Sequence, residues 1–335
     1  MLFEYAITPE VFDAASLCAD EAAARCLLDL LHGISKHGMI ASLDPEIWLN
    51  SVTGAIKKMP PESRDRENLR RCLERLMDTN RLVGERTQTG GEKRQEGDWL
   101  AAILTIHKKI KFHAIVVSSP KLVTPGRNDA PILALKDILD DNLFRVADKT
   151  TKLVRRTVGD VRAALAPVLR HAKKITLIDP HIQPGEERWD RLFRIINSLA
   201  GPEETRNGWR VELVVNAGAR LSPDLRKWRE ALNSLLSARF RVTVNIWSAP
   251  TGLLRAHDRC IITNQCGISC PGGLESHPDA DRVVEKHDWA LMDEDAINER
   301  KQLYDRNSSP YNLVDSIQFS PNPKRGATLA ERLPD

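Results

Sequence analysis

Apolar side chains recur at helical spacing through the first third of the chain. Residues 18–38 and 66–83 each place leucines three or four positions apart, which predicts amphipathic helices with one buried face. Residues 99–109 follow the same pattern, and the β-branched run at 112–118 predicts a strand directly after them. The polar, glycine-rich tract 84–98 predicts a loop. Together these elements indicate a helix-rich α/β domain.

A regular alternation of strands and helices follows in the second half of the chain. Short apolar runs at 174–180, 210–218 and 240–248 predict buried strands, and amphipathic segments separate them. Further strands are predicted at 259–264 and 288–293. This alternation indicates an α/β sheet with helices packed on its faces. The helices are predicted at 157–172, 188–200 and 222–238.

A segment rich in proline and glycine separates the two patterns. It covers 118–131 and predicts a connector rather than a helix or strand. At 335 residues the chain is long enough for about two domains. We therefore expect a helix-rich α/β domain of unknown role over 1–125, a linker over 126–155, a second domain over 156–320 and a loose tail over 321–335.

Composition narrows the class of protein. Hydrophobic residues make up 41% and charged residues 28% of the chain, and no apolar run approaches the ~20 residues that cross a bilayer, so we expect no membrane insertion. The N-terminal residues lack the basic and apolar regions of a secretory signal, and six dispersed cysteines suit a reducing compartment. We therefore expect a cytoplasmic protein. A net charge of +3 is too small to indicate nucleic-acid binding by itself.

Polar residues accompany the ends of several predicted strands. Asp179 and His181 lie at the end of the first of them. The stretch RAHDRCIIT places His257, Asp258 and Arg259 at the start of another. Ligands of α/β sheets bind outside the carboxyl ends of the strands, and charged groups beside a buried strand are costly unless they pair or bind something. Two interpretations stay open: a catalytic histidine with a phosphate clamp, or a structural ion pair.

The order of these motifs resembles that of the phospholipase D superfamily. A strand ending in LIDPHI is followed by two strand–helix units, then by HDRCIITN and a glycine-rich CPGGLE. The superfamily signature is H-x-K-x4-D, and His257, Arg259 and Asn264 stand at its three positions. The sequence around these motifs resembles even more the phospholipase D-like domains at the C-terminus of MIT-domain proteins and their bacterial relatives. The resemblance covers roughly residues 150–310 and includes one copy of the motif.

This resemblance implies a fold and an activity. The fold is a central mixed sheet flanked by helices, and the activity is that of a metal-independent phosphodiesterase without a cofactor. Local basic runs and the absence of a membrane-spanning segment favour a nuclease acting on DNA or RNA over a lipase, and the family's relatives suggest bacterial antiviral defence as its setting. Because the chain carries one motif, the resemblance also implies a homodimer whose two copies face each other across a two-fold axis.

The resemblance also assigns roles to individual residues. His257 is the nucleophile or general acid, because a neutral imidazole can attack phosphorus and form a phosphohistidine. Arg259 stabilises charge on the phosphoryl oxygens, and Glu285 orients the imidazole. The residues expected to contact the substrate are Asn264, Asp179, His181 and Asp258.

Departures from the signature leave a rival interpretation open. The signature lysine is Arg259, which keeps the positive charge and offers a planar fork for phosphate. The signature aspartate is Asn264, and no G-S-x-N sequence follows it. The rival is a catalytically inactive module that binds phosphate-bearing ligands or a protein partner.

Two metal sites are alternative hypotheses. One is a zinc site, although the spacing of its candidate ligands lacks the usual C-x2–4-C knuckle. Those ligands would be Cys260, Cys266, Cys270 and His277. The other follows from a resemblance of the N-terminal region to PIN-type nucleases, in which Glu4, Asp13 and Asp98 would hold Mg²⁺ or Mn²⁺. Activity that persists in EDTA would separate the histidine mechanism from this one.

Overall fold

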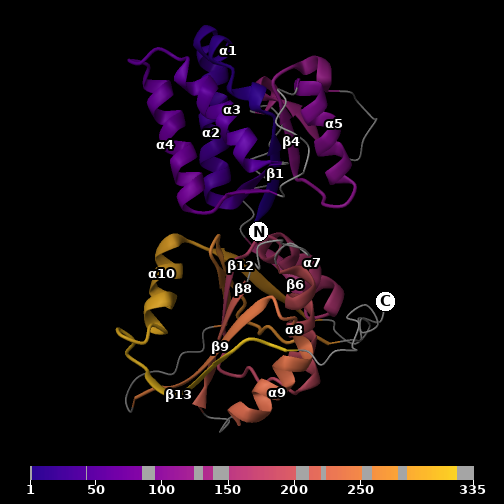
Figure 1. The fold of residues 1–335 in the computed structure, drawn as a ribbon, viewed down its shortest axis with the longest axis vertical. Coiled ribbons are helices and arrows are strands. Elements are labelled where there is room, and N and C mark those ends of the chain that lie inside the picture. Colours follow the sequence, from indigo (N-terminus) through magenta and orange to yellow (C-terminus); the bar gives the residue numbers. More distant parts are fainter. Residues whose placement is uncertain are drawn as a thin grey trace. The chain divides into compact units, whose positions relative to one another are not determined.

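The structure is a computed structural model, and it describes residues 2–42, 44–84, 95–123, 131–138, 151–200, 211–219, 224–250, 259–277 and 285–322. The chain divides into two compact units, Met1–Thr150 and Thr151–Asp335. Both are α/β, and each is described by itself (Figure 1). No helix in these ranges has the length and apolar character needed to cross a bilayer.

The first unit is built on a five-stranded parallel sheet with the strand order β3-β2-β1-β4-β5. The chain moves outward from β1 to β3 and then returns to β4 on the other side of β1, so the direction of winding reverses between β1 and β4. Ligands bind at such reversals, outside the carboxyl ends of the strands. The strands are β1 (Phe3–Ile7), β2 (Gly38–Ser42), β3 (Leu82–Gly84), β4 (Ala114–Val117) and β5 (Ile132–Ala134).

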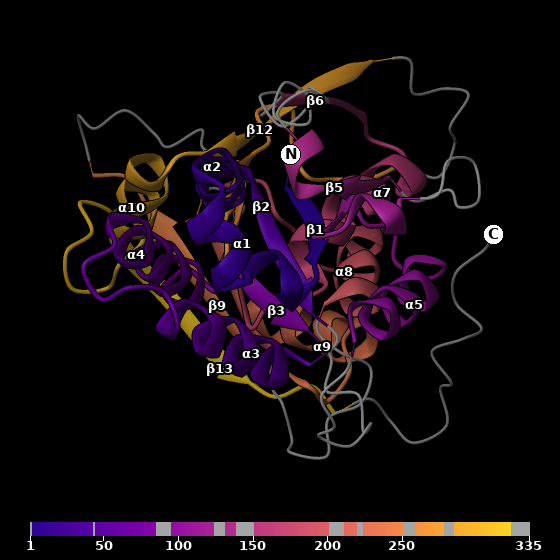
Figure 2. The ribbon, with the colours of Figure 1, turned by 90° about the horizontal axis from the view of Figure 1, so that it is seen from above.

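Helices cover both faces of this sheet, with α1–α4 on one side and α5 on the other (Figures 1 and 2). Helix α2 begins where Asp20 caps it: the carboxylate of Asp20 accepts hydrogen bonds from the backbone N–H groups of Ala22 and Ala23. Its apolar stripe is buried, as the leucine spacing predicted. The helices are α1 (Ala14–Ala19), α2 (Glu21–His37), α3 (Pro45–Lys57), α4 (Arg64–Asp78) and α5 (Glu96–His107), with short 3-10 turns η1 (Pro9–Phe12), η2 (Pro120–Leu122) and η3 (Leu135–Asp137).

The second unit is built on an eight-stranded mixed sheet with the order β13-β9-β8-β7-β10-β11-β12-β6. Strands β7, β8 and β9 are parallel, and the other neighbours are antiparallel. Cys260 pairs with Ile178, so the start of β10 meets the end of β7. The strands are β6 (Thr151–Arg155), β7 (Lys174–Ile178), β8 (Val211–Gly218), β9 (Phe240–Ser248), β10 (Cys260–Thr263), β11 (Gly267–Ser269), β12 (Lys286–Met292) and β13 (Asn312–Phe319).

Different helices pack on the two faces of this second sheet. Helices α7, α8 and α9 lie on one face, and α10 lies on the other (Figures 1 and 2). Under α10, Ile178, Cys260 and Ile262 form an apolar cluster against Ile297 and Tyr304. The strand–helix alternation predicted from the sequence is thus present. The helices are α7 (Val158–Leu169), α8 (Glu187–Leu199), α9 (Leu225–Leu235) and α10 (Glu294–Leu303).

The boundary between the two units, after Thr150, lies inside the predicted linker at 126–155. Two short strands also lie within that segment: β5 pairs with β4 in the first sheet, and β6 pairs with β12 in the second. The sequence pattern missed β6 because four of its five side chains are exposed and carry no apolar alternation. Most of the tail expected at 321–335 lies outside the described residues.

Candidate functional site

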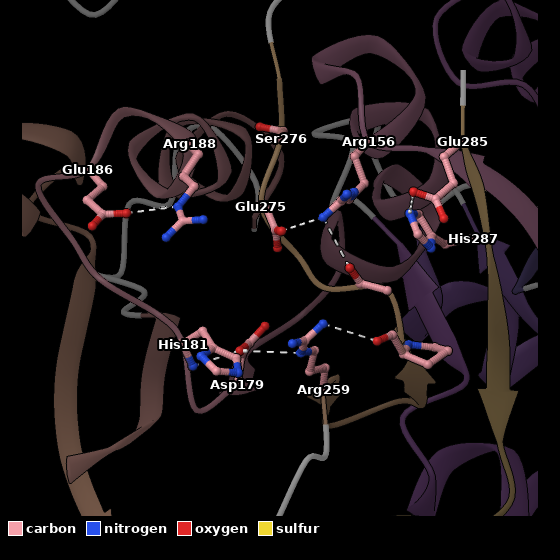
Figure 3. Close-up of polar contacts among 12 residues, drawn as sticks. Arg156, Asp179, His181, Glu186, Arg188, Arg259, Glu275, Ser276, Glu285 and His287 are labelled. Carbon is pink, nitrogen blue, oxygen red and sulfur yellow. Dashed lines mark hydrogen bonds and ion pairs between the residues drawn. The ribbon is translucent and has the colours of Figure 1, made fainter. Parts of the chain in front are cut away.

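Two oppositely charged side chains meet at one end of the second sheet. Asp179 follows the last residue of β7, and Arg259 precedes the first residue of β10. Because these strands are antiparallel neighbours, the two residues lie side by side, with Nε of Arg259 3.8 Å from Oδ1 of Asp179 (Figure 3). This is the carboxyl end of the parallel strands, where α/β sheets bind their ligands.

Asp179 has the side chain with the most unusual environment in the site, because it is only 1% exposed. Its Oδ1 accepts a hydrogen bond of 2.9 Å from the backbone N–H of His181, whereas Oδ2 is buried without a hydrogen-bond partner in the described part of the chain. Burial raises the pKa of Asp179 from 3.8 to about 6. Glu275 adds to this rise, whereas Arg259 and Arg188 oppose it. A buried carboxyl that titrates near neutrality and keeps an unbonded oxygen marks a candidate functional residue.

The loop after β11 supplies carbonyl groups and a carboxylate to the same place. Nη1 of Arg259 donates to the carbonyl of Pro271 at 3.2 Å. Nη1 of Arg156 donates to the carbonyl of Gly272, also at 3.2 Å, and pairs with the carboxylate of Glu275. The loop therefore holds two arginines that are far apart in the sequence of the second unit.

His287 lies on the far side of this loop. A Cβ on Gly272 would stand 2.2 Å from Nδ1 of His287, so only glycine fits between the loop and the ring. Nε2 of His287 lies 3.7 Å from Oε2 of Glu285, whose side chain is 76% exposed. Glu285 was predicted to orient the imidazole of His257, and the structure places it beside a different histidine. His257 and Asp258 lie outside the described residues.

A third arginine reaches the site from α8. Nε of Arg188 donates to the carboxylate of Glu186 at 2.8 Å. The carbonyl of Arg188 accepts a hydrogen bond of 3.2 Å from the backbone N–H of Ser276, which ties α8 to the loop. Figure 3 shows Arg188 and Arg156 on opposite sides of Glu275. Glu275 thus lies between two arginines, of which Arg156 pairs with it and Arg188 pairs with Glu186.

We call these six charged side chains the arginine cluster. Three guanidinium groups oppose three carboxyl groups, so the cluster carries little net charge when every carboxyl is ionised. Guanidinium groups bind phosphate oxygens through paired N–H donors, which makes the cluster chemically suited to a phosphate-bearing ligand. Its members are Arg156, Arg188, Arg259, Asp179, Glu186 and Glu275.

The structure brings Asp179, His181 and Arg259 together, and sequence reasoning named all three. It missed Arg156, which reaches Glu275 from 119 residues away in the sequence. No local pattern marks an arginine of this kind. The signal for the glutamate was present in the CPGGLE motif, since two glycines before a carboxylate indicate a close backbone approach.

Asn264 lies at the other end of β10 from Arg259. Its Oδ1 accepts hydrogen bonds from the backbone N–H groups of Lys173 (2.8 Å) and Lys174 (3.2 Å), at the start of β7. A strand rises about 3.3 Å per residue, so five residues separate Asn264 from Arg259 by roughly 16 Å. Asn264 is therefore set apart from Arg259 in the structure, and its contact with a substrate stays a prediction. An aspartate would accept the same two hydrogen bonds, so the asparagine is no argument against catalysis.

Asn264→Ala is expected to lower the free energy of unfolding by about 1 kcal/mol, because two backbone N–H groups lose their acceptor. Binding of a phosphate-bearing ligand is expected to stay within about twofold of wild type, as for a substitution remote from the ligand. Denaturant unfolding and ligand titration of the same preparation measure both effects. If a folded Asn264→Ala protein no longer binds the ligand, Asn264 contributes to ligand binding.

The described part of the chain holds no set of side chains arranged as zinc ligands. Within the described ranges, no group of three or more His, Cys, Asp or Glu side chains is arranged to hold a metal ion. Cys260, Cys266 and Cys270 are buried, and burial raises the pKa of the Cys270 thiol well above its ordinary value. Zinc needs the thiolate, which such burial disfavours. The backbone of His277 forms a bridge with Thr157.

The first unit holds a cavity of about 390 Å³ where its sheet reverses direction. Glu10, which follows β1, and Ser118, which follows β4, both line it. Burial raises the pKa of Glu10, and repulsion from Glu96 adds to the rise. Glu96 accepts hydrogen bonds from the hydroxyl of Thr8 (2.7 Å) and from the backbone N–H and hydroxyl of Ser118 (2.6 Å each). Oε1 of Glu96 therefore links the residues that follow β1 and β4, and Oε2 adds a second hydrogen bond to Ser118.

The three carboxylates predicted to hold a metal ion have separate positions and other structural roles. Oδ2 of Asp13 accepts hydrogen bonds from the backbone N–H and hydroxyl of Ser16 (3.0 Å each) and caps α1. Oδ2 of Asp98 accepts one from the backbone N–H of Gln95 (3.1 Å) at the start of α5. Glu4 is buried within β1, and only Asp13 of the three lines the cavity. The predicted PIN-type ligand set is therefore wrong for this part of the chain.

Comparison of the chain with models of known protein families finds no match, and comparison with curated proteins finds none. The site brings three arginines and three carboxyl groups together at the carboxyl end of the parallel strands of an α/β sheet, with Arg259 beside the buried Asp179.

Proposed function

We propose that the second unit is a phospholipase D-like domain that binds phosphodiesters at the arginine cluster and hydrolyses them without a metal. One observation carries the proposal: Arg259 pairs with the buried carboxyl of Asp179, whose Oδ2 has no hydrogen-bond partner among the described residues, and two further arginines lie in the same cluster. Buried ionisable groups are costly, and they concentrate where a protein binds or converts a ligand. Both motifs of the resemblance, LIDPHI and HDRCIITN, contribute a residue to this pair.

His257 stands two residues before Arg259 in the sequence, and we assign it the role of nucleophile. Its neutral ring nitrogen attacks phosphorus, so that a P–N bond forms while the P–O bond to the leaving alcohol breaks. The leaving oxygen takes a proton from a second histidine. The second histidine then takes a proton from water, which attacks the phosphohistidine; a P–O bond forms, the P–N bond breaks, and a phosphomonoester leaves the restored imidazole. Arg259 stabilises the negative charge on the non-bridging oxygens in both steps.

The second histidine in this mechanism comes from another copy of the chain. The sequence carries one H-x-R motif, so two motifs require a homodimer with a two-fold axis between the nucleophiles. Sedimentation velocity of the full-length protein should therefore give a dimer.

The substrate class that we propose is DNA or RNA. Lys152 and Arg155 are exposed on the edge strand β6, which ends immediately before Arg156. The positively charged side chains of this strand therefore continue into the arginine cluster. Such runs bind the phosphate backbone of nucleic acids. The setting proposed is the bacterial cytoplasm, in antiviral defence.

The test is cleavage of labelled single- and double-stranded DNA and RNA on denaturing gels, in EDTA and in Mn²⁺. The wild-type protein is expected to cleave in EDTA. His257→Ala is expected to lose roughly 10³-fold or more of this activity, because the nucleophile is absent.

Two other outcomes would redirect the assignment. Cleavage that requires Mn²⁺ and survives in His257→Ala would move the activity away from the arginine cluster. Binding of nucleic acid by the wild-type protein without any cleavage would support the rival interpretation, an inactive module for phosphate-bearing ligands or a protein partner.

A further inference from the structure

Glu275 introduces a negative charge among the three arginines, where a phosphate-binding site would be expected to hold only positive ones. Its carboxylate pairs with Arg156, and its side chain is 15% exposed. A Cβ on Gly273 would stand 2.3 Å from Oε2 of Glu275, so the loop backbone presses against the carboxylate from the other side. Gly273 has φ +104°, a conformation that favours glycine. The position of this carboxylate is thus fixed by the fold of the loop.

The charge of Glu275 acts on the interior of the site. It opposes ionisation of the buried carboxyl of Asp179, although it forms no hydrogen bond with it. Figure 3 shows the carboxylate of Glu275 between Arg188 and Arg156, on the side that faces Asp179 and Arg259. The carboxylate of Glu275 would also repel an anion bound beside Arg259, and this repulsion would grow with the charge of the anion.

We propose that Glu275 makes the site selective for phosphodiesters over phosphomonoesters. This inference rests on the proposed function, because it concerns the ligand of the same site. A phosphodiester carries one negative charge, whereas a phosphomonoester carries close to two above its second pKa of about 6. Because Glu275, Asp179 and Glu186 balance the three arginines, the cluster holds a singly charged group through its paired N–H donors and offers little net attraction for a second charge. The same preference would release a phosphomonoester product.

The test compares two small ligands that differ in one charge. Phenyl phosphate and methyl phenyl phosphate are titrated by calorimetry at pH 8 into the full-length His257→Ala protein, which should turn neither over. Methyl phenyl phosphate is expected to bind at least about tenfold more tightly. Glu275→Gln keeps an oxygen that accepts the hydrogen bond from Arg156 and removes the charge, so phenyl phosphate is expected to gain about tenfold and the preference to disappear.

A matched control removes a carboxylate from a neighbouring arginine outside the site. Asp160 pairs with Arg155 at 2.7 Å, and both side chains are exposed. Asp160→Asn should therefore leave the preference unchanged. If both ligands weaken equally in Glu275→Gln, the residue only positions Arg156 and the inference is wrong. The inference also falls if the preference is unchanged in a folded Glu275→Gln protein, although the proposed function then survives.

If the His257→Ala protein binds neither ligand, both the inference and the proposed function fall together. If Glu275→Gln does not fold, the preference of the parent is measured at 50 and 500 mM salt. A preference that arises from fixed charge is expected to shrink as salt rises. A preference that does not change over this range would overturn the inference.

Discussion

Asp179→Asn is expected to raise the free energy of unfolding by roughly 1–3 kcal/mol at pH 8 and to lower cleavage by about tenfold or more. Burial raises the pKa of Asp179 from 3.8 to about 6, which corresponds to a cost of about 3 kcal/mol for the ionised carboxyl in the folded protein. This cost is fully present above pH 6 and disappears as the pH falls from 6 towards 3.8, where both states are protonated. The amide removes the cost, but it also removes the charge that positions Arg259.

The measurement is hydrogen exchange of the β7 amides in both proteins at pH 8 and at pH 4. The difference in stability is expected at the higher pH and should nearly vanish at the lower one. Because both proteins share every other titrating group, the difference isolates residue 179. A less stable Asp179→Asn protein at pH 8 would show that the buried carboxylate stabilises the fold, and would remove the main physical argument for a functional site.

Arg259→Ala is expected to lower kcat/KM for a phosphodiester by about 10²–10³-fold, the range seen when one donor to a transition-state oxyanion is lost. Arg259→Lys keeps the charge but loses the planar fork, so its kcat/KM is expected to lie between those of wild type and the alanine variant. Steady-state hydrolysis of bis(p-nitrophenyl) phosphate in EDTA measures both.

The control for this prediction is Arg226→Ala. Arg226 lies on α9, pairs with Glu230 at 3.5 Å and is 88% exposed, so its loss should leave kcat/KM unchanged. A folded Arg259→Ala protein with wild-type kcat/KM would contradict the assignment of Arg259 to the site. Arg259 would then be a structural partner of Asp179 only.

Much of the fold could be predicted from the chain, because most elements have a strong apolar period. The leucine stripe of α2 and the buried strands β7 to β9 follow directly from spacing. Strand β6 could not be found this way, since its partner β12 lies far along the chain and its side chains are mostly exposed. Strand order was equally out of reach, because it depends on contacts between distant segments.

For the site, strand ends were the useful signal. Asp179 and Arg259 were located because each adjoins a strand, and neighbouring strands meet at a common edge. Asn264 lies away from this pair, since residues five apart in a strand stand at its opposite ends. Arg156 and Glu275 meet through tertiary structure alone, and no spacing in the sequence connects them.

The pairing of β6 with β12 has a consequence for how the chain is made on the ribosome. Arg155 pairs with Lys286, so the first strand of the second sheet leaves the exit tunnel about 130 residues before its partner. At roughly 5–20 residues per second, the strand waits on the order of ten seconds without a neighbour. An apolar strand in that position would invite aggregation, whereas the charged side chains of Lys152 and Arg155 discourage pairing with other nascent chains. The two basic side chains of β6, and its single buried position, thus suit a strand that must remain soluble until its sheet exists.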